Sequence, residues 1–107
     1  MNLLDYHVLL ALSSGPMHGY AIKDAIAEDS DGTQAPLAGT LYRVIARLMT
    51  EGLVRETSAA ADVLHPGHAR RYYALTATGR KALAEQARQL KEAAAQAERR
   101  LGASRRS

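Results

Sequence analysis

Residues 39–57 read GTLYRVIARLMTEGLVRET, and this stretch decides the fold class. Leu41, Ile45 and Leu48 are spaced four and three residues apart, which is typical of the buried side of an amphipathic helix. A glycine follows, and the next five residues alternate between apolar and polar, as in a half-buried strand. The stretch therefore predicts a helix over about 38–51 that is followed directly by a strand.

A second alternating run covers residues 69–75 and follows a Pro-Gly turn signal. Tyrosine and valine, which favour strands, occur in the two runs. The runs 53–57 and 69–75 predict a β-hairpin with a long tip between them. Tyr72 and Tyr73 point to opposite faces of the second strand, and the sequence leaves open which of them faces the core.

Two helices are expected before this unit. Residues 3–14 are apolar on more than one helical face, which indicates a helix that is buried on more than one side. A second helix is predicted from about 17 to 30, and residues 33–37 form the loop that connects it to the third helix. Three helices followed by a hairpin is the element order of a winged helix–turn–helix.

The C-terminal part predicts one long helix, with Thr76 as its N-cap. Its apolar residues repeat at intervals of four and three, as in a coiled-coil seam. The seam residues are Leu83, Ala87, Leu90, Ala94, Ala97 and Leu101. A helix of this length is too long for the small preceding domain to cover, so the seam predicts pairing with a second copy. Packing inside the protomer is the alternative.

The predicted fold class is mainly α with a small β-hairpin. We expect residues 1–76 to form a winged helix–turn–helix, which is a DNA-binding fold, residues 77–101 a C-terminal dimerisation helix, and residues 102–107 a basic, disordered tail. A chain of 107 residues fits one folded domain with this helical extension.

Composition excludes several classes of function. The absence of cysteine rules out disulfides, thiolate metal sites and a cysteine nucleophile. We expect a cytoplasmic protein, because no signal peptide and no apolar stretch of membrane-spanning length is present. No phosphate-binding glycine loop, nucleophile elbow or catalytic carboxylate pair occurs, so we expect no enzyme activity, no cofactor and no metal site.

The net charge of +3 is unevenly distributed. Residues 1–39 are acidic, residues 40–80 hold six arginines against three acids, and the last nine residues add four arginines. Arg43 and Arg47 lie one turn apart on the polar face of the third predicted helix, which also carries Thr40. In winged helix–turn–helix proteins this helix enters the major groove of DNA.

The second strand carries Arg70 and Arg71, which the hairpin would bring to the DNA backbone. Guanidinium groups bind phosphates and can also pair with guanine edges, so double-stranded DNA is the expected partner. At the start of the second helix, Tyr20 and Lys23 are candidates for phosphate contacts, since helix N-termini favour anions.

Three groups of short motifs, over about residues 3–85, resemble the PadR family of transcriptional regulators. The first group contains Leu10-Ala11-Leu12, Gly15-Pro16, His18-Gly19-Tyr20 and Ile22. The second contains Gly39-Thr40-Leu41-Tyr42, Arg47-Leu48 and Glu51-Gly52-Leu53-Val54. The third contains Arg71-Tyr72-Tyr73, Leu75-Thr76 and Gly79-Arg80.

The resemblance implies a homodimeric repressor that blocks promoters at inverted-repeat operators. It implies that the first and last helices form the dimer interface, which would include Leu4 and Val8. The compact branch of the family, with a single terminal helix, further implies release by a small aromatic effector. Tyr42 resembles a family tyrosine near the DNA backbone, and a packed core tyrosine is the alternative.

The chain departs from the family just before the third helix. Many relatives have Ser-Pro there, whereas this chain has Leu37-Ala38, so the expected side-chain cap is missing. Rival functions remain open at this point: a protein-interaction adaptor that no longer reads DNA, an RNA-binding module, or a nonspecific architectural protein.

Overall fold

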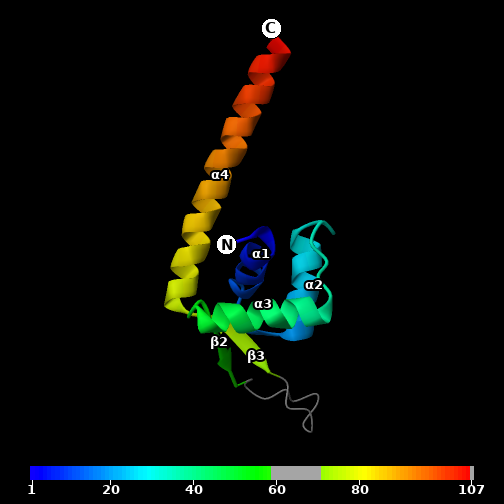
Figure 1. The fold of residues 1–107 in the computed structure, drawn as a ribbon, viewed down its shortest axis with the longest axis vertical. Coiled ribbons are helices and arrows are strands. Elements are labelled where there is room, and N and C mark those ends of the chain that lie inside the picture. The colour runs from blue at the N-terminus through cyan, green and yellow to red at the C-terminus, as the bar shows by residue number, and fades with distance from the viewer. Residues whose placement is uncertain (59–70, 107) are drawn as a thin grey trace.

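The computed structural model describes residues 1–58 and 71–106, and Figure 1 shows a small body from which one long helix projects. The elements, in chain order, are α1 (Leu3–Leu12), β1 (Met17–His18), α2 (Gly19–Asp29), α3 (Ala38–Thr50), β2 (Val54–Thr57), β3 (Tyr72–Leu75) and α4 (Ala77–Arg106). The fold class is confirmed: a mainly helical chain with a small sheet and a long C-terminal helix. The predicted tip of the hairpin, including Arg70, lies outside the described residues.

The core forms where α1, α2 and α3 meet above the sheet. Helix α1 is buried on several sides, and Val8, Leu9 and Leu12 are almost fully excluded from solvent. The predicted stripe of α3 is confirmed, since its three large apolar side chains are equally buried. The core residues, gathered from all three helices and two strands, are Val8, Leu9, Ala11, Leu12, Ile22, Ile26, Leu41, Ile45, Leu48, Val54, Tyr73 and Leu75.

The sheet has a strand that the sequence did not predict. Strand β3 is central and pairs antiparallel with β2 on one side and with β1 on the other. The second helix was expected to begin at residues 17–18, but these two residues pair with Tyr72 and Tyr73 of β3. His18 then caps α2, because its Nδ1 accepts a hydrogen bond from Ala21 N–H at 3.3 Å. This third strand fixes the start of α2 against the hairpin.

The two neighbouring tyrosines of β3 have different surroundings. Tyr73 lies in the core and is 4% exposed. Tyr72 is half-buried on the other face, where its ring meets that of His18 edge to face, with centroids 5.5 Å apart. The open question about this strand is therefore resolved in favour of Tyr73 as the core residue.

Thr76 joins the end of the sheet to the start of α4. Its Oγ1 accepts from Gly79 N–H at 2.9 Å, so the predicted N-cap is confirmed. The same hydroxyl donates to the carbonyl of Gly52, at 2.6 Å, in the turn that ends α3. Gly79 packs against this turn so closely that a Cβ on it would lie 3.0 Å from the carbonyl carbon of Leu53. A glycine in the first turn of α4 is thus required by the close approach of two backbones.

Helix α4 is longer than the sequence predicted. It continues to Arg106, so the expectation that residues 102–107 leave the helix is wrong for all but the last of them, which is not described. Its first turns pack on α1 and β3, with Ala82 and Leu83 against the core. At 1.5 Å per residue its 30 residues span about 45 Å. The distal half extends beyond the body of the protomer (Figure 1).

Within residues 1–58 and 71–106, no helix is long and apolar enough to cross a membrane.

We predict that Gly79→Ala lowers the free energy of unfolding by about 1–3 kcal/mol, because the added methyl group overpacks the contact with Leu53. Gly102→Ala in the same helix is the matched control, since a Cβ there meets no atom within 4 Å. Urea unfolding followed by circular dichroism measures both. Equal midpoints for Gly79→Ala and the parent protein would contradict the close contact.

Candidate nucleic-acid interface

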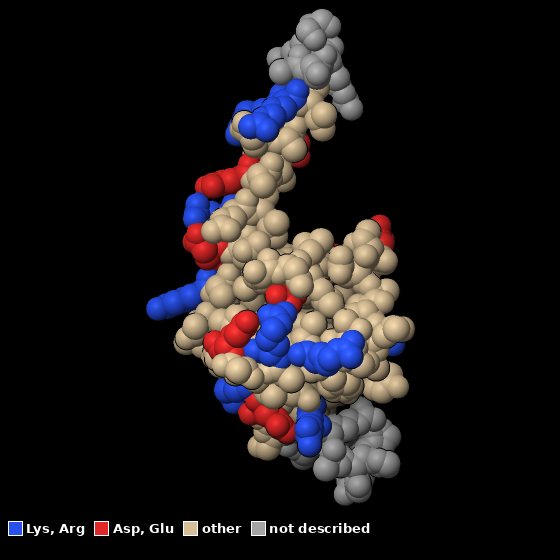
Figure 2. Space-filling view, viewed as in Figure 1, with Lys and Arg blue, Asp and Glu red and all other residues tan. Residues whose placement is uncertain are grey.

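Helix α3 exposes one polar face while its apolar stripe is in the core. The exposed positions follow the helical repeat and include Tyr42, Arg43, Ala46 and Arg47. Figure 2 shows that Lys and Arg side chains gather over α3, with acidic side chains beside some of them. Arg43 and Arg47 therefore both lie on the solvent-facing side of α3.

Arg43 is exposed near the N-terminal end of this face. Its Nη2 donates to Thr40 Oγ1 at 3.4 Å, which is a long contact between two side chains one turn apart. Thr40 itself is half-buried. Because Arg43 makes this weak contact and lies in solvent, its guanidinium is available to a ligand of opposite charge.

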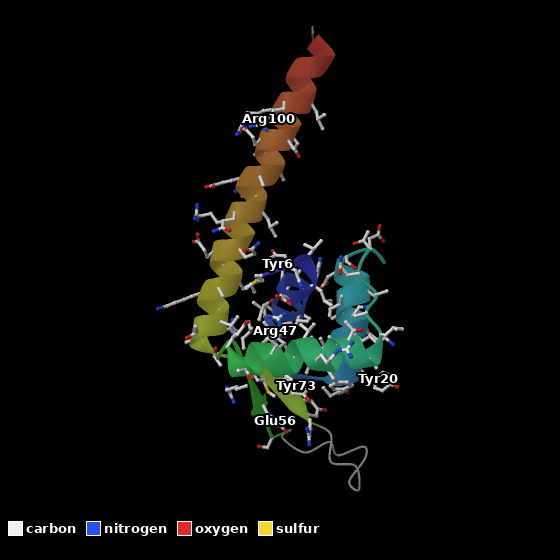
Figure 3. The ribbon with its side chains drawn as sticks, in the orientation of Figure 1. Tyr6, Tyr20, Arg47, Glu56, Tyr73 and Arg100 are labelled. Atoms are coloured by element: carbon white, nitrogen blue, oxygen red, sulfur yellow. The ribbon has the colours of Figure 1, made fainter. Side chains whose placement is uncertain are left out.

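Arg47 has different surroundings, because both of its terminal nitrogens meet carboxylates of the protein. Nη2 forms an ion pair with Asp5 of α1, and Nη1 forms one with Glu51, at 3.2 Å, one turn further along α3. The hydrogen bond to Asp5 and the charge of Asp5 raise the pKa of Arg47 above its ordinary value. Arg47 was predicted to bind DNA, but in this structure it connects α3 to α1 (Figure 3).

Asp5 is the only charged residue in the described core, and it is 2% exposed. Its carboxylate also accepts from the backbone N–H of Asn2 at 3.2 Å, while Asn2 Oδ1 accepts from Asp5 N–H at 2.9 Å. This reciprocal pair is a capping box at the start of α1. A buried carboxylate needs such partners, so Arg47 compensates for part of the cost of burying Asp5.

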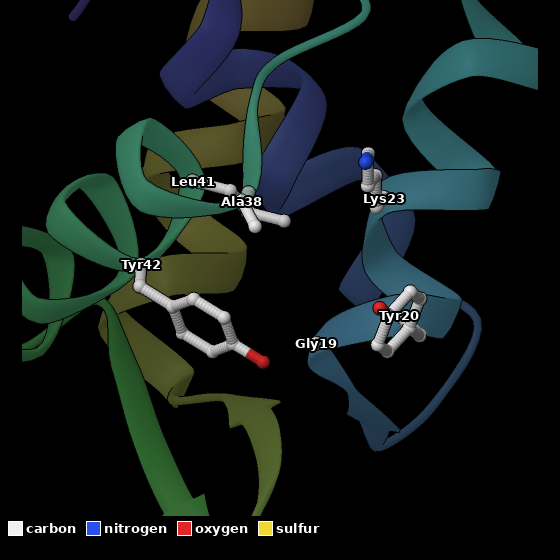
Figure 4. Close-up of a pocket in the computed structure, with 6 residues that line it drawn as sticks. All are labelled: Gly19, Tyr20, Lys23, Ala38, Leu41 and Tyr42. Atoms are coloured by element: carbon white, nitrogen blue, oxygen red, sulfur yellow. The ribbon is translucent and has the colours of Figure 1, made fainter.

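A shallow pocket lies between the start of α2 and the start of α3 (Figure 4). Its lining residues are Gly19, Tyr20, Lys23, Ala38, Leu41 and Tyr42. Tyr20 is 74% exposed at one side of the pocket, and Lys23 is half-buried. Tyr42 is partly exposed rather than a packed core tyrosine. The structure therefore brings the predicted phosphate-contacting residues of α2 together with Tyr42 of α3.

The ring of Tyr42 lies directly over Gly19. A Cβ on Gly19 would be 2.8 Å from Tyr42 Cζ, which is closer than side chains approach one another. Glycine at the first position of α2 therefore allows the hydroxyl end of Tyr42 to reach the N-terminus of this helix. That contact fixes the spacing of α2 and α3 on the exposed side of the body.

The hairpin adds basic side chains below α3. Arg71 is exposed, and its Nε lies 3.8 Å from Glu56 Oε1 on the neighbouring strand (Figure 3 labels Glu56). Arg55 on β2 is also exposed, and the sequence reasoning missed it. The alternation that places Val54 in the core could have identified it, because the next residue must face outward.

Burial raises the pKa of Tyr73, and the neighbouring Tyr42 and Glu56 raise it further. These three residues belong to β3, α3 and β2 respectively, and α3 packs against β2. The raised pKa keeps the Tyr73 hydroxyl protonated to a more alkaline pH than an exposed tyrosine.

The predicted dimer residues fall into three groups. Val8 is fully buried inside the protomer, so its side chain is not available to a partner, and its assignment to a dimer contact is not supported. Leu4 and Leu83 are partly buried against the core of their own chain. The remaining residues lie further along α4: Ala87 and Leu90 are half-buried, whereas Ala94, Ala97 and Leu101 are exposed.

The fold and this surface define a winged helix–turn–helix with a long C-terminal helix. The model of the transcriptional regulator PadR-like family matches residues 8–85. The chain belongs to this PadR-like family, as the short motifs in its sequence suggested. The family consists of transcriptional regulators and not of enzymes, which agrees with the catalytic motifs missing from the sequence.

Known proteins resemble the chain in sequence and in structure. An uncharacterised 37.1 kDa protein of transposon Tn4556 from Streptomyces fradiae is 40% identical over 80 residues, which is 75% of this chain and 21% of that protein. The chain thus spans about a fifth of the length of this relative. A PadR-like transcriptional regulator from Bacillus cereus has the same fold, with a TM-score of 0.78 at 21% identity over 92% of this chain and 91% of the other.

Bacillus subtilis PadR, whose structure was solved in complex with operator DNA, is also similar. Its TM-score is 0.67 at 21% identity, over 79% of this chain and 46% of that protein. At these identities the two solved structures establish the fold.

We predict that Arg47→Met destabilises the protein more than Asp5→Asn does. The first substitution leaves the buried Asp5 carboxylate without its cation, at a cost on the order of 1 kcal/mol or somewhat more because Arg47 is partly solvated. The second leaves Arg47 free to turn into water. Chemical unfolding of both variants and of the double variant measures the coupling.

Arg88→Met serves as the control, because Arg88 makes exposed ion pairs with Glu85 and Glu92 on α4. Its unfolding midpoint should match that of the parent protein. If Arg47→Met also matches the parent, the Asp5 ion pair contributes nothing to stability and its connecting role is wrong.

Proposed function

We propose that this chain is a repressor that binds an inverted-repeat operator as a homodimer and blocks a promoter. The observation that carries the proposal is the two-sided character of α3. One side is buried in the core, and the other presents Arg43 and Tyr42 beside Lys23 of α2 and Arg71 of the hairpin. Such a basic surface around an exposed helix suits the major groove and its flanking phosphates.

The side chains divide into two roles. Arg43 lies near the N-terminal end of α3, the part of a recognition helix that contacts base edges, and its guanidinium fork suits guanine. Thr40 lies one turn before it and suits a thymine methyl group. Arg71, Lys23, Tyr20 and Tyr42 carry donors at the edge of this surface, where phosphates would lie. The operator complex of the related Bacillus subtilis protein supports this class of partner.

The homodimer is supported by the distal half of α4. Leu101 is 64% exposed, and the protomer leaves Ala94 and Ala97 uncovered as well. Leu3 of α1 is also exposed and is available to the same interface, in place of the buried Val8. Pairing of these faces between two chains would place one α3 at each half-site of an inverted repeat.

Release by a small aromatic ligand is the remaining part of the proposal. Such a ligand would bind between the subunits, beside Ala87 and Leu90, and would lower the affinity for the operator. Val8 does not line this site, because no part of its side chain reaches the surface of the protomer.

The proposal is tested by titrating Arg43→Ala and Arg71→Ala with operator and scrambled duplexes at several salt concentrations. Loss of a base contact by Arg43→Ala should cost about 1–3 kcal/mol on the operator and less on scrambled DNA. Loss of a phosphate contact by Arg71→Ala should weaken both duplexes equally and reduce the salt dependence by about one unit per subunit.

Equal losses on both duplexes for Arg43→Ala would make Arg43 a phosphate anchor and not a reader. If the parent protein binds neither duplex in a salt-dependent manner, the repressor proposal fails, and the adaptor alternative is favoured.

We predict that Leu90→Glu converts the protein into monomers and abolishes operator binding at the same time. Leu90 is half-buried at the middle of the seam, and a carboxylate there would be desolvated against its copy. Ala93→Glu, an exposed position outside the seam, should leave both properties unchanged. Analytical ultracentrifugation reports the oligomeric state, and a Leu90→Glu protein that sediments as a dimer would refute the proposed seam.

A further inference from the structure

Leu37, at the N-terminus of α3, is the most exposed large apolar side chain among the residues that the structure describes. It is 77% exposed, although leucine is normally a buried residue. Its backbone is extended, with φ −68° and ψ 152°, and its carbonyl accepts the first helical hydrogen bond, from Leu41 N–H at 3.0 Å. The side chain is therefore held in solvent by an ordered backbone.

The neighbouring residues leave the leucine side chain prominent. Ala38 and Gly39, which follow it in the first turn of α3, are small and exposed. A Cβ added to Gly39 would meet no atom within 4 Å. Leu37 is therefore the only large side chain among residues 37–39. It can contact another surface without obstruction from Ala38 or Gly39.

Leucine at this position lowers the stability of the helix. Leu37 is the N-cap residue of α3, and no side chain provides a capping hydrogen bond there. The other three helices begin differently: Asn2 and His18 cap α1 and α2, and Thr76 caps α4. A serine or aspartate at position 37 would satisfy an N–H group that leucine leaves unsatisfied. The folded protomer gives no reason for this leucine.

The surroundings of Leu37 indicate what could cover it. Ala38, the next residue, lines the pocket that also contains Lys23, Tyr20 and Tyr42. Arg43 is exposed one and a half turns further along the helix. The end of α3 that carries Leu37 thus adjoins a pocket lined by one cation and two tyrosines. A partner that covers Leu37 and this pocket together would offer negative charge and an apolar group. Double-stranded DNA does so in the major groove, where the 5-methyl group of thymine lies between the phosphate backbones.

We propose that Leu37 packs against a thymine 5-methyl group in each half-site and determines the base preference at that position. The inference rests on the proposed function, and it adds a specificity-determining residue outside the polar set of Thr40, Arg43 and Arg71. It assigns a second apolar contact to the residue that begins α3, in addition to the thymine contact proposed for Thr40.

The experiment uses a selected operator in which each thymine is replaced in turn, and symmetrically, by deoxyuridine, which lacks only the methyl group. The full-length parent protein should lose about fourfold in affinity per methyl group contacted, and roughly tenfold or more for the symmetric pair. In Leu37→Ala and Leu37→Ser, replacement of the thymine that Leu37 contacts should have no effect, whereas replacement of a thymine that Thr40 contacts should still lower the affinity. Thr50→Ala, at the far end of α3, should retain the full dependence on the methyl group.

Stability is measured in parallel. Leu37→Ser should melt at the same temperature as the parent protein or higher, because serine supplies the missing cap, while its discrimination against deoxyuridine is lost. This combination separates a contact with DNA from a structural role of the leucine.

The outcomes distinguish a failure of the proposed function from a failure of the inference about Leu37. If the parent protein shows no sequence-specific binding, the proposed function and this inference both fail. If it binds its operator but Leu37→Ala loses the same affinity as the parent at every deoxyuridine, the proposed function stands and Leu37 does not contact thymine.

Discussion

The burial of one side of α3 is the constraint on which the rest of this structure depends. Leu41, Ile45 and Leu48 are almost completely excluded from solvent between α1, α2 and the sheet. Because their spacing leaves a single apolar side, the rotation of α3 about its axis is fixed. The same rotation turns Tyr42 and Arg43 toward solvent. Packing of the apolar side of α3 in the core therefore also determines the orientation of its exposed face.

The position of α3 relative to α1 and α2 is set by an ion pair near one end of the helix and a steric contact near the other. The Asp5–Arg47 ion pair attaches the C-terminal half of α3 to α1, and the contact of Tyr42 with Gly19 attaches the N-terminal half to α2. Helix α1 also packs against α4, the proposed dimer helix. A continuous set of contacts therefore runs from α4 through α1 to α3, which is the connection that a dimer needs to hold two recognition helices at a fixed separation.

Local patterns predicted much of this arrangement. The stripe of α3, the alternation of β2 and the N-cap at Thr76 depend on neighbouring residues, and sequence shows such features directly. Strand β1 could not be predicted, because two residues carry no periodicity and their partners in β3 are over fifty positions away. The partner of Arg47 was missed for the same reason, since Asp5 is 42 residues distant and nothing in the pattern of α3 indicates it.

The account predicts that two copies of this chain read DNA together through α3. Selection of bound sequences from a pool of random duplexes measures this most directly. We predict enrichment of an inverted repeat whose half-sites lie about one helical turn apart, as two α3 helices related by two-fold symmetry require. Enrichment of a single, unrepeated half-site, or of no sequence, would contradict the account.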